Sequence, residues 1–144
     1  GTTMFLINTL GHRITVPELW GTVGAYPGTR NLAGGMATSG AITGWLRSLF
    51  GSPDFSDLTS QAASSPAGAN GLLMLPYFAG ERTPIADPDA RGLIAGLTIE
   101  HNSGDLYRAA LEATAFGVRH NIEAILEAHL TFKANGYFSA VATT

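Results

Sequence analysis

Two segments rich in glycine and hydroxyl groups could bind phosphate. The first is Gly1-Thr2-Thr3, which stands directly before the apolar run at residues 4–7. Two hydroxyls and consecutive backbone N–H groups on a tight turn can hold phosphate oxygens without any lysine. An ordinary start of a strand fits the same three residues, and a tripeptide is too short to decide between these interpretations.

The second segment begins with Gly34-Gly35 and continues through residues 38–41 into an expected helix. Glycines let a ligand approach the backbone, and the unpaired N–H groups at a helix N-terminus favour an anion or the ribose and phosphates of a nucleotide. The alternative is a flexible loop followed by a plain helix cap, for which Ser39 is a suitable residue.

Residues 80–92 form a third candidate, because they include Glu81, Arg82, Asp87, Asp89 and Arg91. The spacing of the two aspartates is that of a calcium loop, but position twelve of that loop would be a threonine instead of the bidentate glutamate. We therefore expect no metal here. The sequence instead predicts a solvated loop in which the two arginines pair with the three carboxylates.

Other chemistries lack the residues that they need. The four histidines show neither an i, i+4 pair nor the H-E-x-x-H spacing of a zinc site, and no G-x-S-x-G motif supports a serine hydrolase. The chain has no cysteine, which removes thiolate chemistry and cysteine-bound metals. Its single lysine, Lys133, lies far from either glycine-rich segment.

Length and composition indicate one folded domain. The chain has 144 residues, 18 of them glycine, and 13% charged residues with a formal net charge of −3, which argues against nucleic-acid and anionic-membrane partners. No apolar run approaches the roughly 20 residues of a membrane helix, and no signal peptide is seen, so a cytoplasmic location is expected. Because the sequence opens at Gly1 without methionine, we expect a fragment.

Hydrophobic periodicity predicts an α/β or α+β order of elements. Strands are expected at residues 4–7, 14–16, 19–23, 71–77 and 137–142, with a turn at Gly11-His12 and irregular structure over 79–97. Helices are expected at residues 39–50 and 54–63, and from about 103 to 129. The last helix has a narrow stripe of mostly small residues, which predicts a closely packed neighbour: Leu106, Ala109, Ala110, Ala113, Phe116 and Gly117.

A resemblance to a known family extends this interpretation. Residues 75–92, which include the run LPYFAGERTP, followed by residues 93–97 and 105–112, resemble the C-terminal signature region of the FGGY-type carbohydrate kinases, in particular the xylulokinase-like branch. Gly1-Thr2-Thr3 resembles the second phosphate loop of that family, and residues 40–47 resemble its nucleotide-contacting helix start. The resemblance spans roughly residues 1–127.

The resemblance implies an actin-like ATPase (ribonuclease H-like) α/β fold, with residues 1–144 as a truncated C-terminal half of a two-domain sugar kinase. Such an enzyme moves the γ-phosphate of ATP, with Mg²⁺, to a hydroxyl of xylulose or a related pentulose or polyol. The partners implied are the sugar, ATP and the missing N-terminal domain, and a homodimer is possible. The residues implied to bind ATP are Gly1, Thr2, Thr3, Gly40, Thr43 and Gly44.

Two departures from the family pattern bear on activity. The catalytic aspartate of the family lies upstream of its Gly-Thr loop and is therefore expected outside this chain. The Gly-Gly-Gly adenine motif expected after the last strand is absent from residues 138–144. We therefore expect half a nucleotide site that is inactive alone. The alternative is a degenerate actin-like domain that acts in protein association without catalysis.

Overall fold

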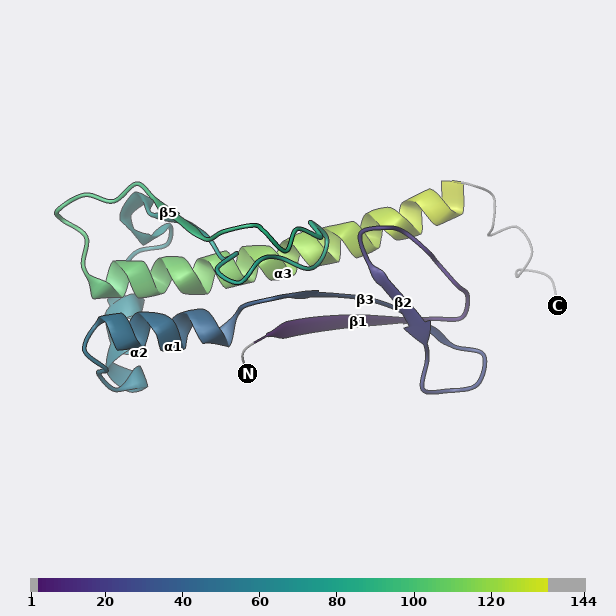
Figure 1. Cartoon of the computed structure of the whole chain (residues 1–144), viewed down its shortest axis with the longest axis horizontal. Helices are drawn as coiled ribbons and strands as arrows, with labels where there is room; N and C mark the ends of the chain where they lie inside the picture. Colours follow the sequence, from purple (N-terminus) through teal and green to yellow (C-terminus); the bar gives the residue numbers. More distant parts are fainter. Residues whose placement is uncertain (1–2, 135–144) are drawn as a thin grey trace.

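Three antiparallel strands and one long helix form the frame of the protein, for which a computed structural model describes residues 3–134. Strands β1 (Met4–Leu10), β2 (Trp20–Val23) and β3 (Arg30–Met36) pair in the order β1-β3-β2. Helix α3 (Ser103–Ala134) runs along the molecule, past the sheet and past a group of shorter elements at the opposite end (Figure 1).

The shorter elements lie between β3 and α3 in the chain. They are α1 (Gly40–Leu49), α2 (Phe55–Ser64), the single 3₁₀ turn η1 (Ala69–Gly71) and a two-stranded antiparallel sheet of β4 (Leu73–Leu75) and β5 (Leu93–Ala95). Both short helices confirm the sequence prediction. Gly51 follows α1 with φ of +81°, a left-handed conformation that glycine adopts without strain and that ends the helix.

The three-stranded sheet packs one face against the second half of α3. Residues from both β1 and β3 share a core with this part of the helix: Leu6, Leu10, Leu32, Ile125 and Ala128. Side chains alternate between the two faces of a strand, so Phe5 and Ile7 of β1 point away from α3. Phe5 stacks on Trp20 on this outer face, with ring centroids 5.6 Å apart.

The first half of α3 packs on α1 and α2 through small side chains. Ala109, Ala110 and Ala113 are buried in one core with residues of both helices, among them Ile42, Leu46 and Leu58. A Cβ on Gly117 would lie 2.5 Å from the Met36 sulfur, so a larger residue there would require the Met36 side chain to move. The predicted stripe is confirmed except at Phe116, which is exposed because the packing line follows every fourth residue and passes beside it.

The strand predictions were less accurate than the helix predictions. Residues 14–16 form no strand and Gly11-His12 no hairpin, because β1 pairs with the distant β3. Gly34-Gly35 is not a flexible point but part of β3, where a Cβ on either glycine would collide with neighbouring atoms. The predicted irregular segment contains β5, and β4 buries only Met74. The strand predicted at residues 137–142 lies outside the described residues.

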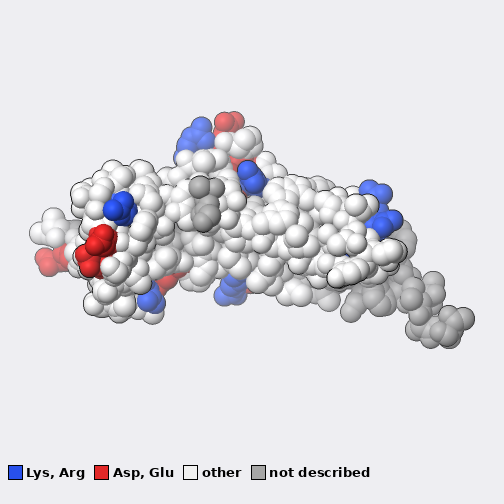
Figure 2. Space-filling view, turned by 90° about the horizontal axis from the view of Figure 1, so that it is seen from below, with Lys and Arg blue, Asp and Glu red and all other residues white. Residues whose placement is uncertain are grey.

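Charged side chains are sparse on the surface. Figure 2 shows Lys, Arg, Asp and Glu scattered singly or in small groups over one face, with uncharged surface between them. Within residues 3–134 no helix combines the length and the apolar character that crossing a bilayer requires.

Candidate functional site

The start of β1 and the start of α1 lie at the same end of the sheet. Antiparallel pairing sets Met4 opposite Met36, so Thr3 lies beside the segment that leads from β3 into α1 (Figure 1). Thr3 and Gly40, two residues that the resemblance assigns to ATP, thus lie at the same end of the sheet. Gly1 and Thr2, from the same predicted set, lie outside the described residues.

The N-terminus of α1 keeps unpaired backbone donors. Ser39 holds the cap position, but its side chain makes no cap hydrogen bond, which corrects the expected role of this residue. Its φ of −145° and ψ of −86° depart from the extended conformation that capping residues usually adopt. The Ile42 N–H donates to the Ser39 carbonyl at 3.1 Å, whereas the N–H groups of Gly40 and Ala41 find no acceptor among residues 3–134. These two donors can bind an anion.

The surface of α1 near its N-terminus is open. A Cβ placed on Gly44 would meet nothing within 4 Å, and Gly40 is exposed. The Thr43 hydroxyl donates to the Gly40 carbonyl at 2.8 Å within the first turn. The predicted residues of α1 therefore form an open surface that a ligand can approach.

The charges around α1 favour an anion at its start. The first turn contains no acidic residue, so the positive end of the helix dipole is not neutralised by the helix itself. Arg47 is turned to the other end of the helix, where its Nε donates to the Pro53 carbonyl at 2.6 Å. Backbone N–H groups and hydroxyls are thus the donors that this end offers.

The loop at residues 80–92 is not held by arginine–carboxylate pairs, which was the prediction. Arg91 approaches Asp89 at 3.9 Å, with both side chains largely exposed, and the Arg82 guanidinium has no partner within the described residues. Instead, the Asp87 carboxylate accepts the Asp89 N–H at 2.8 Å, and the Glu81 N–H donates to the Asp87 carbonyl at 2.7 Å. Arg91 also donates to backbone, from Nη1 to the Ala90 carbonyl at 2.9 Å and the Pro88 carbonyl at 3.4 Å, so most partners in this loop are backbone groups.

Two buried residues of the same loop were missed by the sequence interpretation. Glu81 and Thr83 are 5% and 4% exposed; Glu81 bonds to Ala37, just after β3, and Thr83 bonds to Gly35 at the end of β3. The negative charge of Glu81 adds to burial in raising the pKa of Tyr77. Composition gives no signal for these two positions, because Glu and Thr beside Arg and Pro are typical of a solvated loop.

A second polar cluster surrounds the start of α3. Asp105 is 2% exposed, and its carboxylate accepts hydrogen bonds from the Ser65 hydroxyl at 2.6 Å, the Asn70 amide at 2.8 Å and the Asn102 N–H at 3.0 Å. The Ser65 bond, more than any other contact, holds the pKa of Asp105 below its usual range. Every oxygen of this carboxylate is bonded within the protein, so the cluster is structural.

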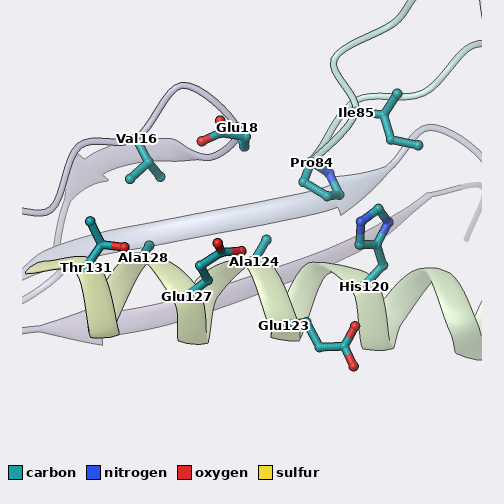
Figure 3. Close-up of a pocket in the computed structure, with 10 residues that line it drawn as sticks. All are labelled: Val16, Glu18, Pro84, Ile85, His120, Glu123, Ala124, Glu127, Ala128 and Thr131. Carbon is teal, nitrogen blue, oxygen red and sulfur yellow. The ribbon is translucent and has the colours of Figure 1, made fainter.

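A cavity of about 680 Å³ lies between the second half of α3 and the loops at residues 16–18 and 84–85. Figure 3 shows Glu123 pointing away from it, and this residue pairs with Arg119 at 2.7 Å. The wall combines apolar residues with His120, Glu18 and Glu127. Within residues 3–134 no three His, Asp or Glu side chains are grouped to hold a metal ion.

Comparison with known proteins gives one consistent family. The model of the C-terminal domain of the FGGY family of carbohydrate kinases matches residues 1–134. The chain is 37% identical over 98 residues to a xylulose kinase of Staphylococcus epidermidis, covering 67% of this chain and 20% of that protein. It is 36% identical over 131 residues to a glycerol kinase of Pseudarthrobacter chlorophenolicus, covering 87% of this chain and 26% of that protein.

Solved structures agree with these matches. The structure is similar to that of xylulose kinase from Rhodospirillum rubrum, with a TM-score of 0.81, 34% identity and coverage of 88% of this chain and 26% of that one. The expected fold, a partial α/β domain from the C-terminal part of an actin-like sugar kinase, is therefore confirmed. The chain spans about a fifth to a quarter of the length of these relatives.

Proposed function

Because this chain belongs to the FGGY family of carbohydrate kinases, we propose that the enzyme containing it transfers the γ-phosphate of ATP to a sugar hydroxyl. The matched relatives include proteins named xylulose kinase and glycerol kinase, so the acceptor in this proposal is xylulose or a related pentulose or polyol. A cytoplasmic location is part of the same proposal.

The observation that carries the proposal is the open N-terminus of α1 beside the start of β1. The N–H groups of Gly40 and Ala41 are unpaired within residues 3–134, and the surface over Gly44 is empty. Fixed donors of this kind stabilise phosphate charge without the reorganisation that water requires. The role of this chain is therefore to bind and orient phosphate oxygens through these donors, together with the hydroxyls of Thr2 and Thr3.

In this proposal, other parts of the enzyme supply the magnesium ligands and the residue that accepts the hydroxyl proton. A metal ion that bridges the phosphates would neutralise their charge. However, the first turn of α1 has no carboxylate, and Glu81 is buried against backbone N–H groups, so the described residues do not fit a metal site here. The aspartate that takes the hydroxyl proton is proposed to lie outside these 144 residues, which makes the chain alone inactive.

A coupled assay of ATP consumption tests the proposal on the enzyme that contains this chain. With xylulose, related pentuloses and glycerol as acceptors, we expect turnover in the range of about 1–100 s⁻¹ with one of them. The 144-residue chain alone should give less than a hundredth of that rate. A complete enzyme that turns over none of these acceptors would favour the non-catalytic alternative.

Thr2→Val tests the phosphate contact. Loss of one hydrogen bond to a charged group costs about 1.5–3 kcal/mol, so the kcat/KM for ATP should fall roughly 10- to 150-fold. Thr2→Ser keeps the hydroxyl and should retain most of the activity. Thr22→Val is the matched control, because the Thr22 hydroxyl on β2 bonds only to the Val23 carbonyl within the described residues. Equal kinetics for Thr2→Val and Thr22→Val would remove Thr2 from the site.

A further inference from the structure

The end of β3 and the segment that leads from it into α1 are bonded to the loop at residues 76–83. The Gly35 N–H donates to the Thr83 hydroxyl at 2.5 Å, and the Ala37 N–H donates to Glu81 Oε1 at 2.9 Å. The Thr38 hydroxyl donates to the Pro76 carbonyl at 2.5 Å. Three of the four residues from 35 to 38 therefore bond to one loop that lies about 40 residues further along the chain.

Glu81 makes the central contact of this set. Its Oε1 accepts a second hydrogen bond from the Arg82 N–H at 2.7 Å, and no Lys or Arg within the described residues pairs with it. The buried carboxylate is therefore stabilised by backbone donors instead of by a cation. Hydrogen bonds to an ionised acceptor are about twice as strong as neutral ones, so Glu81 fixes the Ala37 N–H firmly.

Thr83 connects the loop to α3 through Asn121, a residue that is 1% exposed. Its hydroxyl lies 2.8 Å from Asn121 Oδ1, and the Asn121 amide donates to the Gly117 carbonyl at 3.0 Å. Gly34 makes this approach possible, because a Cβ there would collide with both Asn121 and Thr83. The loop is thus anchored on α3 on one side and holds the chain before α1 on the other.

From these contacts we infer that Glu81, supported by Thr38 and Thr83, is a positioning residue for phosphate binding at the start of α1. Ala37 precedes the unpaired donors of Gly40 and Ala41 by only three or four residues, so the bond to Glu81 sets the direction in which α1 begins. None of these contacts uses the Gly40 or Ala41 N–H, so both donors stay unpaired within the described residues. This inference rests on the proposed function, since it assigns Glu81 a role in binding ATP.

Glu81→Ala in the enzyme that contains this chain is the main test, with Glu81→Gln as the conservative variant. Glu81→Ala should raise the KM for ATP about tenfold or more while the KM for the sugar changes less than about twofold. Glu81→Gln keeps an acceptor oxygen and should stay within about threefold of the wild type. Glu100→Ala, at an exposed position, is the matched control with no expected change.

Amide hydrogen exchange without nucleotide gives a second readout. Peptides that cover residues 36–44 should exchange on the order of tenfold faster in Glu81→Ala than in the wild type or Glu100→Ala. This measurement needs no ATP, so it still decides the holding role if the wild-type enzyme proves to transfer no phosphate. Failure of the proposed function and failure of this inference are therefore distinguishable.

A purely structural role would give a different pattern. Glu81→Ala would then lower the melting temperature but leave both the ATP KM and the exchange of residues 36–44 unchanged, and that result overturns the inference. If Glu81→Ala does not fold, Thr38→Val with Thr38→Ser as its control replaces it, since it removes only the bond to Pro76. The Val variant should raise the ATP KM and the Ser variant should not; equal values for both overturn the inference.

Discussion

At the start of α3 the Gly104 and Asp105 N–H groups donate to a side chain of the protein, whereas at the start of α1 the Gly40 and Ala41 N–H groups find no acceptor among the described residues. Asn102 Oδ1 accepts the Gly104 N–H at 2.8 Å, and the Asp105 carboxylate returns a bond to the Asn102 N–H at 3.0 Å. This reciprocal arrangement is a capping box with aspartate in the acidic position. Ser39, at the same place before α1, has no such bond.

The difference separates a structural helix start from a ligand-binding one. Asp105 also bonds to Ser65, directly after α2, and to Asn70 of η1, so the capped end ties α3 to both of these elements. At α1 the fixing contacts come from Glu81, and the donors stay unpaired within the described residues. The N-terminus of a helix can thus keep backbone N–H groups unpaired and still be fixed in position when another segment bonds to the chain before it.

Of the substitutions that test this difference between the two helix starts, Asp105→Ala is expected to have the largest effect. The change removes three hydrogen bonds and leaves the buried Ser65 hydroxyl without its partner, so the melting temperature should fall on the order of 10 °C. Thermal unfolding followed by circular dichroism measures it. Asp57→Ala, at an exposed position in the first turn of α2, should change the melting temperature by no more than about 2 °C. Similar values for the two variants would show that the capped end is not structural.

Acid should weaken the capped end selectively. The Ser65 bond first, then the Asn102 N–H, lower the pKa of Asp105 in the folded state, so its stabilising contribution is complete above the unfolded value of 3.8 and is lost as pH falls through the lower folded value. Asp105→Asn should therefore be less stable than the wild type at pH 7 but show a flatter decline in melting temperature below about pH 4. Parallel curves for both proteins would contradict this assignment.

Glu112 also contributes to the fall in the melting temperature of the wild type at low pH. Its bond to Arg108, first, and to the Gly68 N–H lower the pKa of Glu112 from 4.5, so its contribution has the same sign and begins to fade at slightly higher pH. Asp105→Asn should leave that part of the slope in place. Glu112→Gln then removes it, which separates the two carboxylates.

The helices could be predicted from the sequence, and so could the positions of β1 and β2, whereas β3 and the strand pairing could not. Apolar residues recur at helical spacing in α1 and α3, and that local signal gave both elements correctly. β3 was missed because Gly34-Gly35 is typical of a turn. Glycine is required there by residues distant in the chain: Thr83 and Asn121 lie against Gly34, and the Met4 carbonyl lies against Gly35. Strand pairing depends on such distant contacts, which no local window contains.

Of the candidate site, only the residues that the family resemblance covers could be predicted from the sequence. Gly40, Thr43 and Gly44 lie on an open helix start, as that resemblance implies, and their contact with ATP stays a prediction. Glu81 could not be found, because a glutamate in a loop is usually solvated and its burial follows from the fold of residues 35–38 against that loop.

Ser39→Asp would make the open N-terminus of α1 more like the capped N-terminus of α3. A carboxylate at this position interacts favourably with the helix dipole and should stabilise the protein by about 0.3–1 kcal/mol in urea unfolding. The same charge repels phosphate, so the KM for ATP should rise about tenfold. Ser39→Asn, a neutral capping residue of the same shape, is the control and should raise it less. An unchanged KM in Ser39→Asp would mean that phosphate does not bind at this helix start.

The smallest effect is expected from Arg91→Ala, although Arg91 lies in the same loop as Glu81. The Arg91–Asp89 pair is 3.9 Å long and its side chains are 70% and 93% exposed, so water screens the attraction and the free energy of unfolding should change by less than about 0.5 kcal/mol. Urea unfolding of Arg91→Ala and Glu81→Ala side by side measures the contrast, since only the second residue contacts the chain before α1. Addition of 1 M salt should not change the wild-type midpoint through this pair. A loss of more than about 1 kcal/mol in Arg91→Ala would restore the arginine–carboxylate interpretation of the loop and weaken the assignment of its rigidity to Glu81.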